Sequence, residues 1–269
     1  MPQMAIGTNW MNYKDLYKVV KAGFEAGFRA IDTAHDYGNE PVVGKVLHDV
    51  LHDIGLKRSD VFVTTKIGNV QQIEGYIEEQ LDISLKNLQT DYIDLWLMHW
   101  PYPGYFKKSW KEMQRLYRTT DKVKAIGVAN FSVRHFEDMM SNEDCEIYPM
   151  VNQIEFHPLR TVPSLTSYMA EHHIQLEAYA PLCRLVPQLK DSPIFTLLEQ
   201  KYNKSIGQII LRWHVQLGNV PIFKSYKPSR FAENIDIFDF ELTHEEMDSI
   251  SALNIDYKYH IESPNCPGY

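Results

Sequence analysis

Short apolar segments alternate along the chain with longer segments whose apolar residues recur every three or four positions. The short segments are rich in β-branched residues, as buried strands are, and lie near 4–7, 29–31, 61–63, 93–98, 125–128, 150–154, 175–179 and 220–222. The longer segments predict amphipathic helices, with apolar faces at Leu16, Val19, Val20, Ala22 and Phe24; at Ile73, Ile77, Leu81, Leu85 and Leu88; and at Ile206, Ile209, Ile210, Trp213 and Leu217. Such alternation predicts parallel strands joined by helices.

Eight strand–helix units favour a closed (β/α)₈ TIM barrel, which typically needs about 250 residues. The 269 residues fit a single barrel domain over 1–269. An open doubly wound sheet is the alternative, but it usually carries a GxGxxG turn, which is absent here. The tail, 254–269, is rich in Tyr, Pro and Asn and predicts a long loop on the substrate side.

Composition excludes several classes of protein. The net charge is -8 without a block of five like charges, which argues against a nucleic-acid surface. Cys145, Cys183 and Cys266 show no CxxC spacing, so we expect a reducing compartment and no disulfide framework. Neither a signal peptide nor a run of 18 apolar residues occurs, and we expect a cytoplasmic monomer or weak homo-oligomer without membrane contact.

Four polar residues are predicted to meet at one end of the barrel. Asp32, Lys66 and His99 each fall where a strand ends, and Tyr37 follows Asp32 in a loop. The carboxyl ends of barrel strands open onto the face that holds the active site. A buried ammonium can lower the pKa of a phenol, a carboxylate can balance that ammonium, and an imidazole can orient a substrate oxygen. Each residue alone has an ordinary structural explanation, but their joint placement predicts a general-acid site.

The sequence resembles the aldo-keto reductase family over its length to about Leu253. The resemblance rests on residues 27–34 (GFRAIDTA), 37–44 (YGNEPVVG), 65–66 (TK), 97–101 (LMHWP), 124–131 (KAIGVANF), 152–158 (NQIEFHP), 178–182 (AYAPL) and 224–234, where Lys224, Ser225, Arg230, Glu233 and Asn234 match. It implies the catalytic residues Asp32, Tyr37, Lys66 and His99. It also implies that NADPH supplies a hydride to a carbonyl carbon while Tyr37 protonates the oxygen.

The resemblance further implies a cofactor site, formed by Gly7, Thr8, Asn130, Gln153, Tyr179, Leu182, Lys224, Ser225, Arg230, Glu233 and Asn234. Tyr179 offers an aromatic face to the nicotinamide, or is an ordinary core tyrosine. Asn130 and Gln153 can pair with its carboxamide. The cations Lys224 and Arg230 suit a 2′-phosphate and so favour NADPH over NADH, although they could also be a solvated helix start.

Some positions depart from the family pattern. Ala129 and Ala180 stand where Ser is usual (Cys also occurs at the first), Cys183 where Gly is usual, and Phe223 where a small residue or Pro is common. These changes predict an altered cofactor affinity. The N-terminal hairpin that plugs the barrel floor in many relatives is either absent or precedes this sequence, and we expect a more exposed floor or one covered by a partner.

The predicted substrate is a small apolar or ring-bearing aldehyde or ketone, as for the family's diketogluconate and methylglyoxal reductases. Its predicted contacts are Trp10, His35, Trp100 and Tyr102, with Tyr105, Asn265, Cys266 and Tyr269 as further candidates. Asn9 could take the place of Trp10. A cofactor-binding regulatory module is the main alternative function. A metal-dependent barrel enzyme is a third, but His35, His99, His157, His172 and His173 show no metal-site spacing, and we expect no metal.

Overall fold

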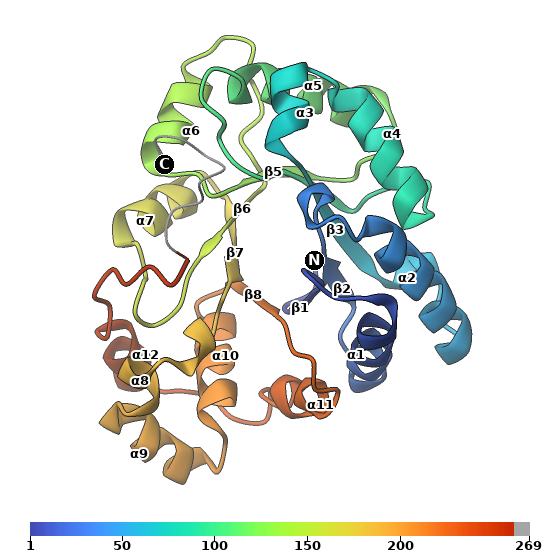
Figure 1. Ribbon diagram of the computed structural model, residues 1–269. Coiled ribbons are helices and arrows are strands. Elements are labelled where there is room, and N and C mark those ends of the chain that lie inside the picture. The colour runs from blue at the N-terminus through green and yellow to red at the C-terminus, as the bar shows by residue number, and fades with distance from the viewer. Residues whose placement is uncertain (261–269) are drawn as a thin grey trace.

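The computed structural model describes residues 1–260 and contains a closed barrel of eight parallel strands in chain order, with helices around it (Figure 1). The strands are β1 (Ala5–Gly7), β2 (Ala30–Asp32), β3 (Phe62–Ile67), β4 (Leu95–Met98), β5 (Ile126–Ala129), β6 (Val151–Glu155), β7 (Gln175–Tyr179) and β8 (Val220–Phe223). β8 pairs with β1 and closes the ring. All eight predicted strands, and the (β/α)₈ barrel itself, are confirmed.

Helices cover the outside of the strands. They are α1 (Tyr13–Ala26), α2 (Glu40–Ile54), α3 (Asn69–Glu74), α4 (Ile77–Leu88), α5 (Phe106–Thr119), α6 (Val133–Met140), α7 (Pro163–Glu171), α8 (Pro187–Lys190), α9 (Pro193–Tyr202), α10 (Ile206–Gln216), α11 (Ser229–Ile235) and α12 (His244–Ser251). Short 3₁₀ turns are η1 (His35–Tyr37), η2 (Arg58–Asp60) and η3 (Cys183–Leu185). Two of these turns, η1 and η3, follow β2 and β7 and shape the mouth of the barrel.

The helix predicted before the fourth strand differs from the structure at its start. Ile73 lies in the separate helix α3, which ends at Gly75 in the left-handed region, with φ of 77°. The side chain of Ile73 is exposed, whereas Leu81 and Leu88 of α4 are buried. The expectation that Ile73 belongs to the apolar face is therefore wrong, because the glycine turns the chain before the core-facing helix begins. Leu217 is also exposed, just after α10 ends.

The largest apolar cluster fills the space between the strands and the helices and includes the buried Trp96, Trp110 and Trp213. Two small apolar clusters contain strand residues of the barrel, and Phe62, at the amino end of β3, packs against both. Residues 1–4 form no strand. Phe62 and Met150, near the amino ends of their strands, are half-buried, and the expectation of a more exposed floor stays a prediction.

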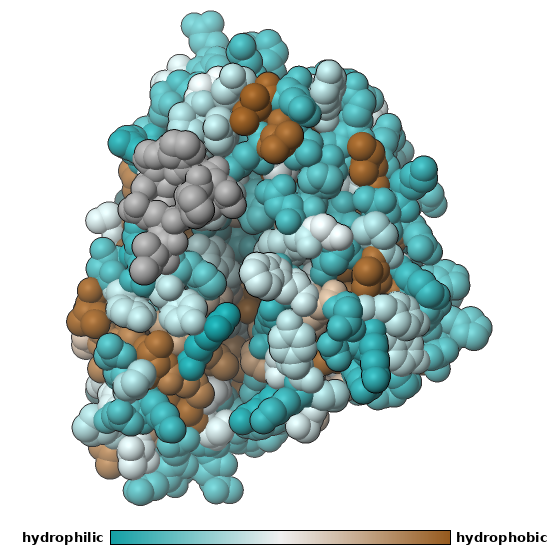
Figure 2. Space-filling view, in the orientation of Figure 1, coloured by the Kyte–Doolittle hydropathy of each residue, from teal (hydrophilic) through white to brown (hydrophobic). Residues whose placement is uncertain are grey.

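Over residues 1–260, no helix is long and apolar enough to cross a membrane. Cys145 and Cys183 are buried and unbridged, while Cys266 lies outside the described residues. The face seen in Figure 2 is mostly hydrophilic, with apolar atoms gathered where α8 and α12 lie in Figure 1. The tail returns along the mouth as far as His260, and Tyr257 donates its backbone N–H to Leu159.

Candidate active site

The four residues predicted to meet do come together at the carboxyl ends of the strands. The Lys66 ammonium on β3 donates to both carboxylate oxygens of Asp32 at 2.9 and 2.7 Å, and to the carbonyl oxygen of Thr33 at 2.9 Å. The same ammonium lies 3.5 Å from the hydroxyl oxygen of Tyr37, which ends η1. The His99 ring packs edge-on against the Tyr37 ring, with centroids 5.7 Å apart. The carboxylate, the ammonium, the phenol and the imidazole therefore lie together, as the sequence predicts.

Burial and charge act in opposite directions on this pair. Burial raises the pKa of Tyr37 and the Lys66 ammonium lowers it, and the net shift is upward. The ammonium does lower the pKa of the phenol, as expected, but burial has the larger and opposite effect. Burial would lower the pKa of Lys66, but the charges of Asp32 and Tyr37 outweigh it and raise that pKa. At neutral pH the site thus holds a protonated phenol beside a protonated amine.

His99 is held by a carboxylate that the sequence reading did not single out. Its Nδ1 lies 3.1 Å from Oδ2 of Asp36, the residue before Tyr37. Burial lowers the pKa of His99, and the hydrogen bond with Asp36 raises it, with a net shift downward. A neutral ring that donates from Nδ1 leaves Nε2 as an acceptor. A Cβ at Gly68 would lie 2.0 Å from Oδ1 of Asp36, so a glycine is needed for this approach.

Asn130 and Tyr179, two predicted nicotinamide contacts, are joined to each other. The Tyr179 hydroxyl donates to Oδ1 of Asn130 at 2.9 Å, and Nδ2 of Asn130 donates to the carbonyl oxygen of His99 at 3.0 Å. Asn130 adopts a left-handed backbone, with φ of 63°. This residue therefore ties the ends of β4 and β7 across the mouth and holds the Tyr179 ring there.

Gln153 links Asp32 to a further buried acid. Its Nε2 donates at 2.8 Å to Oδ2 of Asp32 and at 2.8 Å to Oε2 of Glu177. Strand register explains the contact, because Gln153 on β6 pairs with Glu177 on β7. Burial raises the pKa of Glu177 to about 7, and the charge of Asp32 adds to this. Glu177 lies in the strand expected near 175–179 but was not among the predicted site residues.

Gly7 and Thr8, at the end of β1, lie beside Asp32. Gly7 pairs in register with Asp32, and a Cβ on Gly7 would lie 3.5 Å from Cβ of Lys224. The Thr8 hydroxyl donates to the carbonyl oxygen of Asp32 at 3.0 Å. Thr8 therefore has a structural role in holding the end of β2, whatever else it contacts.

Two cations lie close enough on the β7 and β8 loops to affect one another. Burial and the charge of Arg184 lower the pKa of Lys224. Arg184 lies in η3, where it stacks over Tyr259 at 5.3 Å, and was not among the predicted site residues. Because the repulsion between these cations would be relieved by an anion, the loops suit a phosphate group.

The remaining predicted phosphate and adenine residues lie on and before α11. Nη1 of Arg230 donates to both oxygens of Glu233 at 2.7 and 2.8 Å, so much of its charge is already balanced. The Ser225 hydroxyl accepts the backbone N–H of Lys227 at 3.0 Å. Asn234 is buried, and Gly207 separates it from Leu182: a Cβ there would contact both side chains at 3.8 Å.

The residues that depart from the family pattern differ in backbone conformation and packing. Cys183, Arg184 and Leu185 are consecutive left-handed residues, with φ of 43°, 48° and 51°, and Ala180 has φ of 50°. Such a backbone favours glycine, so Cys183 adopts a strained conformation at a position where the family pattern predicts Gly. Ala129 is buried and pairs in register with Gln153. Phe223 packs edge-on against Phe231, which places its bulk in the core and away from the mouth.

The predicted substrate contacts have different settings. Trp100 stacks obliquely on His99 at 6.2 Å, and Tyr102 lies beside Tyr105 at 5.9 Å. Trp10 is 82% exposed and accepts a hydrogen bond from Tyr226 through its carbonyl oxygen. The His35 ring is held between Gln80 and Gln71, at 2.8 and 3.2 Å, which gives it a structural role in docking α3 and α4.

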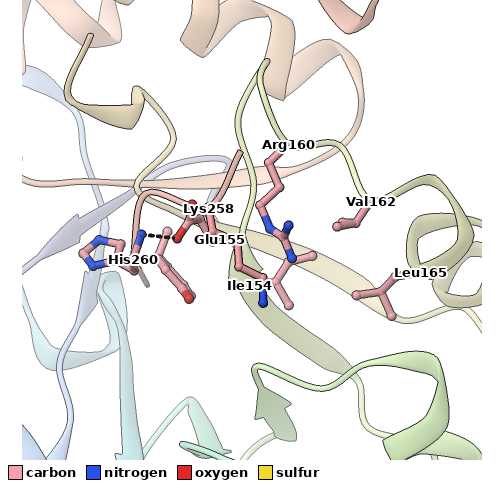
Figure 3. Close-up of a pocket in the computed structure, with 8 residues that line it drawn as sticks. Ile154, Glu155, Arg160, Val162, Leu165, Lys258 and His260 are labelled. Carbon is pink, nitrogen blue, oxygen red and sulfur yellow. Dashed lines mark hydrogen bonds between the residues drawn. The ribbon is translucent and has the colours of Figure 1, made fainter. Parts of the chain in front are cut away.

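The described end of the tail contacts Glu155, at the carboxyl end of β6. Glu155 accepts the backbone N–H groups of Tyr259 at 2.5 Å and His260 at 2.8 Å, and the second bond is drawn in Figure 3. Burial would raise the pKa of Glu155, but these bonds and the one with His157 lower it. A pocket opens here, lined by Ile154, Glu155, Arg160, Val162, Leu165, Tyr179, Lys258 and His260. Asn265, Cys266 and Tyr269 lie outside the described residues.

No group of three or more metal-ligating side chains occurs within 1–260. The histidines considered as ligands are in separate environments: His157 contacts Glu155 at 3.0 Å, whereas His172 stacks on Tyr148 at 4.5 Å.

The fold and the site define a barrel enzyme with a phenol, an ammonium, a carboxylate and an imidazole at its mouth. Residues 3–255 match the Aldo/keto reductase family. The chain is 43% identical over 257 residues to the glyoxal reductase of Bacillus subtilis, covering 95% of this chain and 90% of that enzyme. It is 38% identical over 256 residues to the methylglyoxal reductase DkgA of Escherichia coli, covering 94% and 90%.

Solved structures agree. An aldo-keto reductase of Bombyx mori, crystallised with NADP, superposes with a TM-score of 0.90 at 33% identity, covering 100% of this chain and 95% of that one. The chain therefore belongs to the aldo/keto reductase family and is an oxidoreductase.

Proposed function

We propose that this protein reduces small aldehydes or ketones with NADPH, using Tyr37 as the proton donor. The main support is the position of the Lys66 ammonium, which is hydrogen-bonded to buried Asp32 and lies 3.5 Å from the Tyr37 hydroxyl oxygen. A phenol donates a proton readily only when its phenolate is stabilised as it forms, and a fixed cation provides that stabilisation. The proposal rests on this arrangement more than on any single residue type.

The residues present fit a nicotinamide dinucleotide phosphate. Lys224 and Arg184 offer two mutually repelling cations to a phosphate. Tyr179 offers a ring held in place by Asn130, beside the catalytic residues. Arg230 already donates to Glu233, so it can bind the phosphate only with the guanidinium N–H groups that Glu233 leaves free. When bound, the reduced cofactor supplies a hydride to the substrate carbon.

The chain's own residues perform the proton chemistry. Tyr37 protonates the carbonyl oxygen, and the Lys66 ammonium stabilises the phenolate that forms. Asp32 keeps that ammonium charged and, together with the Thr33 carbonyl, fixes its position. His99 is oriented by Asp36 and packs against the Tyr37 ring, where it can contact the same substrate oxygen. Burial of these groups strengthens each electrostatic interaction.

The proposed substrates are small dicarbonyls and related aldehydes. The two relatives named for glyoxal and methylglyoxal reduction support this choice. Trp100 supplies aromatic surface next to His99, Tyr102 lies beside Tyr105, and the pocket beside Tyr179 adds polar groups at the tail. A regulatory module that binds the cofactor without turnover has less support, because binding alone does not need the Tyr37–Lys66–Asp32 contacts.

The test is NADPH oxidation followed by absorbance against methylglyoxal, glyoxal, a keto sugar and an aromatic aldehyde. The proposal predicts turnover with at least one, and a higher kcat/KM with NADPH than with NADH. Tight NADPH binding without turnover of any of them would favour the regulatory module.

A further inference from the structure

Glu177 is a buried acid that the proposed proton transfer does not use. It is 2% exposed and lies on β7, inside the barrel, behind the catalytic residues. Burying a carboxyl group in the middle of a barrel strand is costly unless its charge is balanced or removed by a proton. Its position therefore needs an explanation.

A continuous set of contacts joins Glu177 to the proton donor. Gln153 donates to Glu177 and to Asp32 from the same amide nitrogen, at 2.8 Å each. Asp32 accepts from Lys66 at 2.7 Å, and Lys66 lies 3.5 Å from the Tyr37 hydroxyl. Asp32 thus shares one oxygen between the ammonium and the amide. A change of charge on Glu177 acts on the phenol through these groups and through the low-dielectric interior.

The surroundings of Glu177 favour a change of charge in the neutral range. The charged groups that face it are Asp32 on β2 and Lys66 on β3, with the Tyr37 phenol beyond them. On β6 it faces the neutral Gln153, and on β8 it pairs with Val220, which cannot ionise. One cation thus faces two carboxyl groups. Asp32 has the direct contact with that cation, so Glu177 is the carboxyl group that gains a proton first.

We propose that Glu177 is a positioning residue whose protonation state sets how readily Tyr37 gives up its proton, acting through Gln153, Asp32 and Lys66. This inference rests on the proposed reductase function. A neutral Glu177 leaves the Lys66 charge available to the forming phenolate. An ionised Glu177 draws on that charge and disfavours a second negative charge at Tyr37. Glu177 is hydrogen-bonded to Gln153, so it acts on the phenol indirectly, through Gln153, Asp32 and Lys66.

The first experiment is the pH profile of kcat/KM for the reduction of methylglyoxal, in wild type and in Glu177→Gln. A neighbouring charge shifts a pKa by about one unit, and a rate follows part of that shift, so we expect wild type to fall about threefold to tenfold between two plateaus as pH rises through about 7. Glutamine has the shape of a neutral glutamic acid but cannot ionise, so kcat/KM of Glu177→Gln should stay at the higher value across this pH range. An unchanged inflection in this variant would overturn the proposal.

Glu40→Gln is the matched control. Glu40 is another buried carboxyl group of the barrel, but it accepts hydrogen bonds from Thr65 at 2.7 Å and Ser84 at 3.2 Å. Burial alone would raise the pKa of Glu40, and its hydrogen bonds, that of His35 first, outweigh this and lower it. The control should keep the wild-type inflection. If it loses the inflection as Glu177→Gln does, the effect belongs to buried carboxyl groups in general and the proposal fails.

A second readout does not need turnover. The infrared band of a protonated carboxyl group, taken as the difference between wild type and Glu177→Gln, should disappear with a midpoint near 7. In Asp32→Asn the same midpoint should fall by about one unit, because the carboxylate that repels the second charge is gone. A midpoint in the ordinary acid range, or one that Asp32→Asn leaves unchanged, would overturn the inference. Because no substrate is used, failure of the proposed reductase function cannot produce either result.

Discussion

Removing one member of the buried ion pair should cost much more stability than removing both. Lys66 is 1% exposed, and its ammonium donates to Asp32 and to the Thr33 carbonyl. In Lys66→Met the Asp32 carboxylate keeps only the Gln153 amide as its donor among these contacts, and it faces Glu177 without a cation. Breaking a buried pair in this way costs about 3–5 kcal/mol of unfolding free energy. For a chain of this size that is a fall in Tm of about 10 °C.

The double variant Asp32→Asn with Lys66→Met should recover part of that loss. It removes the unpaired charge while keeping the shape of the carboxyl group and an apolar chain of similar length. The coupling free energy between the two sites, obtained from unfolding free energies in a double-mutant cycle, should therefore exceed the loss caused by Asp32→Asn alone. The deficit of Lys66→Met alone should also shrink from about pH 8 to pH 5, because a buried carboxyl group can avoid its unpaired charge by binding a proton.

Urea unfolding followed by circular dichroism measures all four proteins. Additive losses, with the double variant as unstable as the sum of the single ones, would refute the reasoning. They would mean that Asp32 and Lys66 do not compensate each other in the folded protein.

Three further predictions concern the cofactor loops and His99. Lys224→Ala should weaken NADPH binding about tenfold to hundredfold, as expected for a lost charge-assisted bond, with little change for NADH; equal losses in fluorescence titrations would contradict a phosphate contact. Ala129→Ser should tighten NADPH binding about twofold to tenfold if its hydroxyl gains one hydrogen bond, and an unchanged Kd would mean that the hydroxyl finds no acceptor. Asp36→Asn should lower the pKa of His99 further, by about one unit in an NMR titration of the ring protons, because the hydrogen-bonded carboxylate that raises it is lost; an unmoved titration would rule out that contact.

The barrel was predictable because its signals are local. A run such as Ile126–Ala129 is apolar and β-branched whatever it packs against, and the carboxyl end of each strand then places its last polar residue at the mouth. Asp32, Lys66 and His99 could be brought together by that rule alone. The break between α3 and α4 was missed, because the spacing of Ile73 and Ile77 is helical even though Gly75 interrupts the helix between them.

The contacts that tune the site were not predictable in the same way. Asp36 meets His99 across 63 positions, through the exact turn that η1 makes over Gly68. Glu177 meets Gln153 through strand register, which the strand pattern alone does not fix. A charged residue in an otherwise apolar buried strand was the available signal for Glu177. Arg184 affects the pKa of Lys224 from a turn in which three consecutive residues take a left-handed backbone, which the residue types there do not favour.

The central claim is that the Tyr37 hydroxyl supplies the proton. Single-turnover reduction of methylglyoxal by Tyr37→Phe, with NADPH binding measured in parallel by fluorescence, tests it most directly. We expect NADPH to bind as in wild type and the hydride-transfer rate to fall by about two to four orders of magnitude, the usual contribution of a general acid. A variant that binds NADPH and reduces the carbonyl at the wild-type rate would contradict the account.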